Sequence, residues 1–420
     1  MMMVMFKSLA AVSCRVPDLQ KAKEWYGQFF DDPAVLDSPF VVVFRAGDST
    51  LNLVPAGDSH PGSEERVVAY WNVEDIDLAY RRLLDAGATS QSEITTTVMR
   101  TRVARVADPF GNALGLMSRA AAADKSKSLE DQPSDSAMGV ALSRALAAGD
   151  EREEIRGPDY LAEAFLSADA RRSLKDAAAR EWIRKKLGTE APGSYEYFIA
   201  RTGYIDAVVR RALEEGTPQL VFLGAGYDSR SYRFRDLVRG TRIFELDIEP
   251  TQQRKRRALG QAGIAIPPQL TFVSIDFTRD RLEDVLEASG YDKKKKALFV
   301  WEGVMYYLPA EAVDRTLEFV RSNSAVGSVL CFDYLAAAPD MADRYGVRES
   351  RAIMRAMYRA ELVQFSIPEG AVESFLSERG FRLIDHLTPE EMEQRYLTLR
   401  DGTLAGKVLA CFRLARAAVA

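Results

Sequence analysis

Glycines and acids end four predicted strands in the second half of the chain, and their spacing suits a ligand site. The apolar run 220–223 stops at Gly224 and Gly226, which allow a tight turn and a close approach of the backbone to a ligand. The later strands end in Glu245 and Asp247, then Asp276 with Phe277, and then Glu302. Ligands of open α/β sheets bind at the carboxyl ends of strands, so we expect these residues to meet at one site.

This pattern favours the binding of a nucleotide-like cofactor. An acid at the end of the second strand, about twenty residues after the glycine turn, typically binds two ribose hydroxyls. Upstream, Tyr197 and Arg201 share one face of a predicted helix, where an arginine beside aromatic rings suits a carboxylate ligand. An ion pair between Arg201 and Asp206, or another acid, explains the arginine equally well. A nicotinamide-dependent oxidoreductase fits less well, because Ser229 stands where its third glycine is expected.

Alternating strands and helices predict the sheet that positions these residues. The expected strands are 220–223, 242–247, 270–275, 298–301 and 328–334, followed by a closing antiparallel edge pair at 381–386 and 407–414. This order indicates a mostly parallel, Rossmann-like doubly wound α/β sheet. We expect helices before residue 190 to form a cap over the sheet, and a helix-prone insertion at 339–363 to cover the site.

The first part of the chain shows an internal duplication. Residues 6–117 predict a strand, a helix opened by Asp18 and two strands, and then a strand, a helix opened at Asp75 and three strands. Two tandem βαβββ units of α+β type are therefore expected. The following polar stretch has no apolar periodicity and is typical of a linker. The predicted organisation is a first domain at 1–118, a linker at 119–136 and a second domain at 137–420.

The composition of the chain excludes several function classes. Its 420 residues exceed one compact core, and a net charge of -5 gives no basic excess for nucleic acid. No apolar run of about eighteen residues predicts a membrane span, and Lys7 interrupts the apolar start where a signal peptide would need continuity. Cys14, Cys331 and Cys411 are far apart and predict buried thiols in a reducing compartment. We therefore expect a cytoplasmic protein without nucleic-acid or membrane partners.

The first domain resembles the glyoxalase/bleomycin-resistance (vicinal oxygen chelate) superfamily, through CRVPDLQKAKEWY, YWNVEDIDLAYRRLLDAGA and VADPFGNALGLM. The resemblance implies a cupped sheet that often binds a divalent metal through four His or Glu-type ligands. At those four positions this chain has Ala11, Asn52, Val68 and Gly115, none of which is a usual metal ligand.

No metal is therefore expected in this domain, whose one histidine, His60, lies in a predicted loop. A cupped sheet without a metal could still bind a small molecule or mediate homodimerisation. Asn52, Trp71 and Arg102 are candidates to line its concavity, although packing or solvent exposure explains them as well.

The second domain resembles the leucine carboxyl methyltransferase family of S-adenosylmethionine-dependent O-methyltransferases, over about residues 130–415. Five ordered segments carry the resemblance: YEYFIARTGYIDAVV, VFLGAGYDSRSYRF, FELDIEPTQQRKR, VSIDFT and VWEGVMYYLP. It implies S-adenosylmethionine as the cofactor and a small-molecule methyl acceptor as the partner.

The resemblance also implies a role for each matching residue. For the methionine part of the cofactor these are Tyr197 and Arg201 at the carboxylate, Gly224 and Gly226 at the backbone approach, and Asp228 and Arg230 holding the turn. Glu245 or Asp247 would bind the ribose, and Asp276 with the Phe277 backbone would meet the adenine edge. Glu302 would lie near the methionine amine and the methyl group, and Tyr307 would contact the acceptor. The departures are Ser229 in place of a threonine and the large Trp301, which is expected to narrow the acceptor pocket.

The nature of the acceptor follows from the scarcity of bases. A carboxylate has a pKa of about 4 and needs no base at neutral pH, whereas a phenol or alcohol needs one. His386 is the one histidine of the second domain and lies in a predicted edge strand. A carboxylate or acidic hydroxyl is therefore the favoured acceptor. The alternative function is a binding or sequestering protein, in which the cupped sheet holds a small molecule and the second domain is a degenerate methyltransferase.

Overall fold

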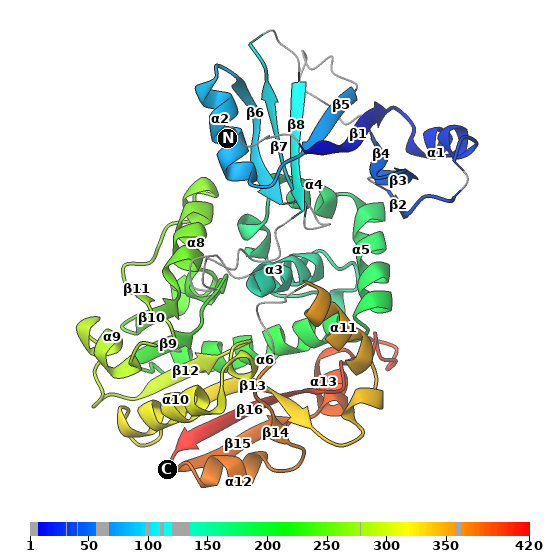
Figure 1. Cartoon of the computed structure of the whole chain (residues 1–420). Coiled ribbons are helices and arrows are strands. Elements are labelled where there is room, and N and C mark those ends of the chain that lie inside the picture. Colours follow the sequence, from blue (N-terminus) through cyan, green and yellow to red (C-terminus); the bar gives the residue numbers. More distant parts are fainter. Residues whose placement is uncertain are drawn as a thin grey trace. The chain divides into compact units, whose positions relative to one another are not determined.

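The computed structural model forms two compact units (Figure 1). The first contains Met1–Ala123 and Ser167–Ile183, and the second contains Asp124–Leu166 and Arg184–Ala420. The structure describes residues 7–30, 32–39, 41–55, 67–96, 101–109, 113–119, 135–277, 279–357 and 363–420. The loop of His60 and most of the predicted linker lie outside the described residues.

The first unit contains the two predicted βαβββ repeats. The first repeat is β1 (Ser8–Val16), α1 (Leu19–Gly27), β2 (Leu36–Ser38), β3 (Val41–Ala46) and β4 (Ser49–Pro55). The second is β5 (Val67–Asn72), α2 (Ile76–Asp85), β6 (Thr89–Thr96), β7 (Thr101–Ala107) and β8 (Ala113–Arg119). The sequence prediction missed the three-residue strand β2, which is too short to show an alternating pattern. The duplication itself is confirmed.

The two repeats build one sheet with matching halves. Its order is β2-β3-β4-β1-β5-β8-β7-β6, and β1 pairs parallel with β4 as β5 does with β8. The predicted helix starts are confirmed, because the side chains of Asp18 and Asp75 accept hydrogen bonds from Lys21 N and Leu78 N. These bonds satisfy backbone donors that the first helical turn leaves unpaired.

The side chains of this sheet divide between a face that packs against α1 and α2 and the opposite face. Ala104 and Leu116 pack in one core cluster with Ile76 and Ala79 of α2. Alternation along each strand places Trp71 and Arg102 on this same face, where Arg102 forms a two-pronged ion pair with Asp77 of α2 at 2.6 and 2.9 Å. Of the two readings left open for Trp71 and Arg102, packing agrees with this position and lining of the cup does not.

The four positions aligned with metal ligands share the opposite face. Across neighbouring strands, Ser13 lies opposite both Asn52 and Val68, and Tyr70 lies opposite both Ala11 and Gly115. Residues that lie opposite one another point to the same face of the sheet. A Cβ added at Gly115 would lie 2.5 Å from the Tyr70 ring, so that ring occupies the space above this position. In the described part of the chain, no cluster of three or more His, Cys, Asp or Glu side chains is arranged to hold a metal ion.

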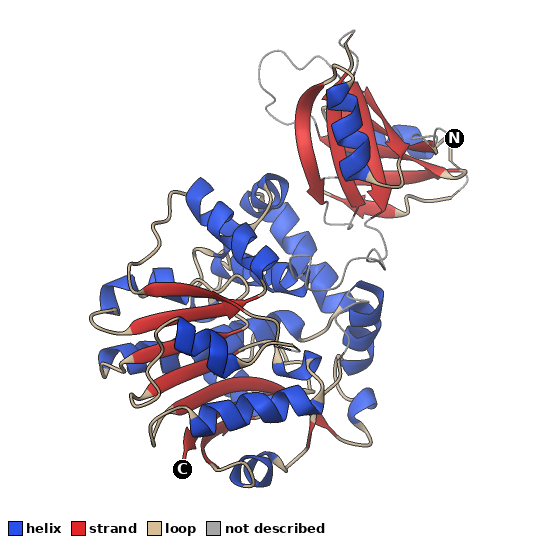
Figure 2. Ribbon diagram, turned by 60° about the vertical axis from the view of Figure 1, so that its left-hand side comes forward, coloured by secondary structure: helices blue, strands red, loops and turns tan. Residues whose placement is uncertain are grey.

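The second unit is an α/β sheet flanked by helices (Figure 2). Its strands are β9 (Gln219–Leu223), β10 (Arg242–Asp247), β11 (Leu270–Ser274), β12 (Ala297–Trp301), β13 (Val329–Ala337), β14 (Ile367–Pro368), β15 (Phe381–Leu387) and β16 (Phe412–Val419). Helices before the first strand are α3 (Asp135–Ala148), α4 (Ala168–Lys175), α5 (Ala177–Glu190) and α6 (Ser194–Glu214). Later helices are α7 (Arg230–Arg233), α8 (Glu249–Gln261), α9 (Leu282–Ala288), α10 (Ala310–Ser322), α11 (Val347–Met357), α12 (Val372–Ser377) and α13 (Pro389–Tyr396). Residues 168–183, which hold α4 and half of α5, group with the first unit.

The sheet order is β11-β10-β9-β12-β13-β16-β15, with β9 to β13 parallel and β16 antiparallel to both neighbours. This confirms the predicted doubly wound sheet with an antiparallel pair at one edge. The last strand begins at Phe412 rather than at residue 407. The backbone donors Leu409 N and Ala410 N precede it and instead bond Gly193 O and Tyr345 O. Because these groups are used in tertiary contacts, the strand begins only after them.

Described helices carry no candidate membrane span, since none combines the necessary length and apolar character. The three cysteines are unpaired thiols, and burial raises the pKa of each.

Candidate functional site

The turn after β9 has a backbone that only glycine adopts readily. Gly224 and Gly226 have φ angles of +76° and +46°, and Gly303, which follows β12, has +73°. A Cβ on Gly224 would lie 2.3 Å from Val304 Cγ2, so a larger residue there also meets a steric clash. These turns therefore bring the backbone close to the space beyond the strand ends.

Helix α3 of the predicted cap packs against this turn. A Cβ on Gly226 would touch Ala137 Cβ at 3.4 Å, and Arg144 donates a hydrogen bond to Tyr227 O at 2.8 Å. Arg144 also pairs with the buried Asp159 at 3.5 Å. The start of the cap thus contacts the loop at the carboxyl end of β9.

The two acids of β10 have different surroundings. Asp247 ends the strand, is partly buried, and accepts hydrogen bonds from Gly226 N at 2.6 Å and Ile248 N at 2.8 Å. Glu245 is fully buried and binds Lys255 Nζ and Ser231 Oγ, each at 2.7 Å. Burial raises the pKa of Glu245, although Lys255 opposes that effect. Glu245 is thus fully paired inside the core, whereas Asp247 lies at the carboxyl end of β10 beside the glycine turn.

Glu302 lies between two buried arginines. Its Oε1 is 3.0 Å from Arg201 Nε, and its Oε2 accepts a hydrogen bond from Arg230 Nη1 at 2.6 Å. Burial alone would raise the pKa of Glu302, but the positive charges of Arg230 and Arg201 lower it below its usual value. Glu302 is therefore held ionised.

Arg230 is the centre of a wider network of buried charges. Besides Glu302 it binds Asp228, at 2.5 Å through Nη1 and at 2.7 Å through its own backbone N, and Asp206 at 2.7 Å through Nε. Asp206 also binds Arg233 Nη1 at 2.5 Å. Asp206 thus pairs with Arg230 and Arg233. The alternative of an ion pair for Arg201 holds with other acids, Glu302 and Asp333, and not with Asp206.

Tyr197 and Arg201 of α6 both bind Asp333, a residue that the sequence analysis did not single out. Tyr197 donates its hydroxyl to Asp333 Oδ2 at 2.5 Å, and Arg201 donates Nη1 to the same oxygen at 2.9 Å. Gly303 N donates to the other oxygen at 2.6 Å. The available signal was an acid inside the apolar strand VLCFDYLAA, where an ionised side chain needs partners.

The remaining predicted residues lie at the same ends of their strands. Asp276 and Phe277 follow β11, where Asp276 N bonds Asp280 Oδ2 at 2.8 Å and the Phe277 side chain packs against the core. Tyr307 ends a short helical turn, Met305–Tyr307, after β12. Gln364 Nε2 donates to Tyr307 O at 2.7 Å, which places the residue after the predicted insertion beside this tyrosine.

Two other expectations concern large or titratable side chains. Trp301 is fully buried in the sheet core, and its effect on the shape of an acceptor pocket stays a prediction. His386 lies in the edge strand β15 as predicted, and its Nε2 is 2.9 Å from Tyr334 Oη. Burial and the nearby Arg413 lower the pKa of His386.

Comparison with known proteins places this chain in a family. The model of the leucine carboxyl methyltransferase family matches residues 137–321. "Putative S-adenosyl-L-methionine-dependent methyltransferase YktD" of Bacillus subtilis is 30% identical over 49% of this chain and 68% of its own length. A relative with the same description from Mycolicibacterium smegmatis is 31% identical over 52% of this chain and 71% of its own length. The chain belongs to the leucine carboxyl methyltransferase family.

The first unit matches a second family model. Residues 8–116 match the glyoxalase/bleomycin resistance protein/dioxygenase superfamily, as the sequence analysis expected.

Among solved structures, the chain is 17% identical to "a putative methyltransferase from Thermobifida fusca YX", with a TM-score of 0.43 over 69% of this chain and 95% of that one.

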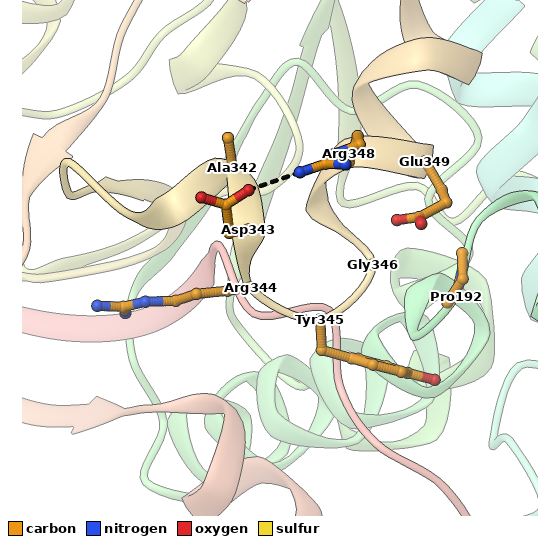
Figure 3. Close-up of a pocket in the computed structure, with 8 residues that line it drawn as sticks. All are labelled: Pro192, Ala342, Asp343, Arg344, Tyr345, Gly346, Arg348 and Glu349. Atoms are coloured by element: carbon orange, nitrogen blue, oxygen red, sulfur yellow. Dashed lines mark hydrogen bonds and ion pairs between the residues drawn. The ribbon is translucent and has the colours of Figure 1, made fainter.

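A surface pocket of about 350 Å³ lies elsewhere in the methyltransferase unit (Figure 3). Residues 342–346, 348 and 349, at and before the start of α11, line it together with Pro192 from the turn before α6. Its charged side chains include Arg348, which donates to Asp343 at 2.6 Å, and Glu349 (Figure 3). None of the predicted site residues lines this pocket, so it is distinct from the cluster around Glu302.

Proposed function

We propose that the second unit binds S-adenosylmethionine at the carboxyl ends of β9, β10 and β12 and transfers its methyl group to an oxygen of a small molecule. The observation that carries the proposal is the meeting of Arg201, Glu302 and the glycine turn, which are far apart in sequence. A cationic group, an ionised acid and bare backbone match the carboxylate, the amine and the chain of an amino-acid moiety.

A buried donor atom supports this fit. Arg230 Nη2 has no hydrogen-bond partner among the described residues, although the Arg230 side chain is buried. Buried donors are rarely left unpaired, and an anionic ligand group is one way to satisfy them. The family resemblance, which covers residues 137–321, points to the same cofactor.

The remaining contacts are proposed by position. Asp247 rather than Glu245 binds the ribose hydroxyls, because Glu245 is fully buried against Lys255 and Ser231. Asp276 and the backbone of Phe277 meet the adenine at the end of β11. Asp228 and Arg230 hold the glycine turn and Glu302 in place.

S-adenosylmethionine supplies a methyl group that is already activated on a sulfonium. The protein therefore has to align donor and acceptor, and orientation alone can lower the activation free energy by several kcal/mol. Glu302 fits the methionine amine because two arginines keep it ionised. The same arginines make it a weak base, so it is poorly suited to deprotonating an acceptor.

This weakness favours an acceptor that is already anionic, namely a carboxylate or an acidic hydroxyl. His386 does not provide a base near Glu302, since it lies in the edge strand β15 and contacts Tyr334. Tyr307 contacts the acceptor in this proposal, and Gln364 fixes its backbone. We further propose domains at 1–118 and 137–420, with the first unit contributing to acceptor binding or to a homodimer.

The test uses S-adenosylmethionine with an isotopically labelled methyl group and a panel of carboxylic acids and phenols. Methyl esters release labelled methanol in mild base, whereas aryl methyl ethers do not, so the linkage identifies the acceptor class. Label that stays fixed after base treatment contradicts a carboxylate acceptor. No titration heat with S-adenosylmethionine at high micromolar concentration contradicts the methyltransferase itself and favours the binding-protein alternative.

A further inference from the structure

Asp333 connects three segments of the methyltransferase unit at one buried point. Its side chain in β13 is fully buried. One carboxylate oxygen accepts hydrogen bonds from Tyr197 Oη at 2.5 Å and Arg201 Nη1 at 2.9 Å, both from α6. The other accepts the backbone N–H of Gly303 at 2.6 Å, from the turn after β12. Both oxygens are thus used by donors from other elements.

The charges and hydrogen bonds around Asp333 hold its partners in one orientation. An ionised carboxylate without water is costly unless it is paired and hydrogen-bonded, and Arg201 supplies the opposite charge. Burial, followed by the charge of Asp333, raises the pKa of Tyr197 well above its usual value. Tyr197 therefore acts as a protonated donor at neutral pH. The stacking of Tyr197 on Phe412, with ring centroids 4.0 Å apart, fixes the direction of this donor.

The guanidinium of Arg201 is consequently fixed from two sides. Asp333 binds Nη1 and Glu302 lies beside Nε, so the plane of the group has little freedom. A Cβ on Gly303 would lie 3.3 Å from Arg201 Nη1, which shows how closely the glycine backbone approaches the arginine. One carboxylate therefore sets the relative position of Arg201 and of the Gly303 turn.

We infer that Asp333 is the positioning residue for recognition of the methionine carboxylate and amine. It acts through Arg201 and Gly303 and does not itself touch the ligand. The inference rests on the proposed function, since it names how the amino-acid end of the donor is recognised. Its consequence is selective: loss of Asp333 impairs binding of the amino-acid end while leaving binding of the adenosine end intact.

The experiment compares two ligands in titration calorimetry with the full chain. S-adenosylmethionine carries the amino-acid end, whereas 5′-methylthioadenosine keeps the adenosine and sulfur but lacks the carboxylate and amine. In Asp333→Asn, of nearly the same volume, affinity for S-adenosylmethionine should fall by about tenfold or more, as expected for loss of a charged hydrogen bond. Affinity for 5′-methylthioadenosine should stay within about twofold of the original value.

Two further variants separate positioning from folding. Tyr197→Phe removes one donor to Asp333, keeps the ring, and should give a smaller loss with the same selectivity. Asp150→Asn is the matched control, because Asp150 is also a buried carboxylate that binds a tyrosine hydroxyl (Tyr195, 2.9 Å) and an arginine (Arg152, 2.8 Å). It should leave both affinities unchanged.

Equal weakening of both ligands by Asp333→Asn, or weakening of neither, overturns the inference. If Asp333→Asn does not fold, Tyr197→Phe decides by the same criterion. Absence of S-adenosylmethionine binding by the unmodified protein is a different result, because it overturns the proposed function.

Discussion

Arg230 donates a hydrogen bond to Glu302, with 2.6 Å between Nη1 and Oε2, although 72 positions separate them in the sequence. Arg230 begins the short helix after the glycine turn, and Glu302 follows the neighbouring strand β12. The contact joins two adjacent strand ends and fixes the ionisation of Glu302. In the proposed function, the stability of the fold and the binding of the donor therefore depend on the same buried charges.

Arg230→Ala should be among the most destabilising single changes in the methyltransferase unit. It leaves Asp206, Asp228 and Glu302 buried near one another without their shared counter-charge, which should cost about 3–5 kcal/mol of unfolding free energy. Urea denaturation followed by circular dichroism measures the loss. The control is Arg211→Ala, which breaks an exposed pair with Glu215 and should cause no measurable change. Similar effects of the two variants would contradict the network.

Gly224→Ala should destabilise the protein more than a positive φ angle alone explains. Its Cβ would meet Val304 Cγ2 at 2.3 Å, so strain and a clash add, and about 2 kcal/mol or more is expected. Gly216→Ala is the matched control, with φ +71° and no atom within 4 Å of the added Cβ. Denaturation midpoints of the two variants give the difference. Adding Val304→Ala should recover part of the loss in Gly224→Ala, and no recovery would mean that the clash is not its source.

Asp150 should give a pH-dependent contribution to stability. Burial alone would raise its pKa, but hydrogen bonds from Arg152 and Tyr195 outweigh that effect and lower the pKa from 3.8 to about 2. A carboxyl whose pKa is lower in the folded protein than in the unfolded chain stabilises the fold at pH values above the unfolded pKa. This stabilisation is lost as pH falls from 3.8 toward 2. Asp150→Asn should thus be less stable at neutral pH, and its difference from the original protein should shrink in acid. Urea titrations from neutral pH downward test this, and a constant difference below pH 4 would argue against it.

Tyr307→Phe should separate donor binding from acceptor binding. The proposal places the Tyr307 hydroxyl at the acceptor, so affinity for S-adenosylmethionine should remain within about twofold while kcat/KM for the acceptor falls. Tyr291→Phe is the control: Tyr291 lies before β12, at the opposite end of that strand, and its hydroxyl bonds Asn323 O. Calorimetry and initial rates measure the two quantities. A loss of donor affinity in Tyr307→Phe would place this residue at the cofactor.

Divalent metals should have no specific effect on the first unit. Ala11, Val68 and Gly115 offer no ligating side chain, and the Tyr70 ring covers the space above Gly115. Zn²⁺ and Mn²⁺ titrated into chelator-treated protein should therefore give no saturable heat, and the melting temperature should not change. Stoichiometric binding would show that other side chains supply ligands.

The positions of strands and turns followed from local patterns. Gly224 and Gly226 after an apolar run, and acids after the next strands, are short-range signals, because a buried strand and a positive φ angle each restrict the residues that fit. The repeated order of elements in the first unit was equally local. For these reasons the doubly wound sheet, the duplication and the shared edge of the site residues were predictable.

Pairings across the sequence depended on the tertiary structure. The sequence could not assign Asp206 to Arg230 rather than Arg201, nor distinguish the buried Glu245 from the rim residue Asp247. It also gave no partner for Asp333. Its side-chain donors are Arg201, which is 132 residues away in the sequence, and Tyr197, which is 136 residues away. The amino-acid sequence by itself determined which residues stand at strand ends, since backbone conformation is a local property. Only the packing of α6 against β12 and β13 decided which charges neutralise one another, because that depends on long-range proximity and burial.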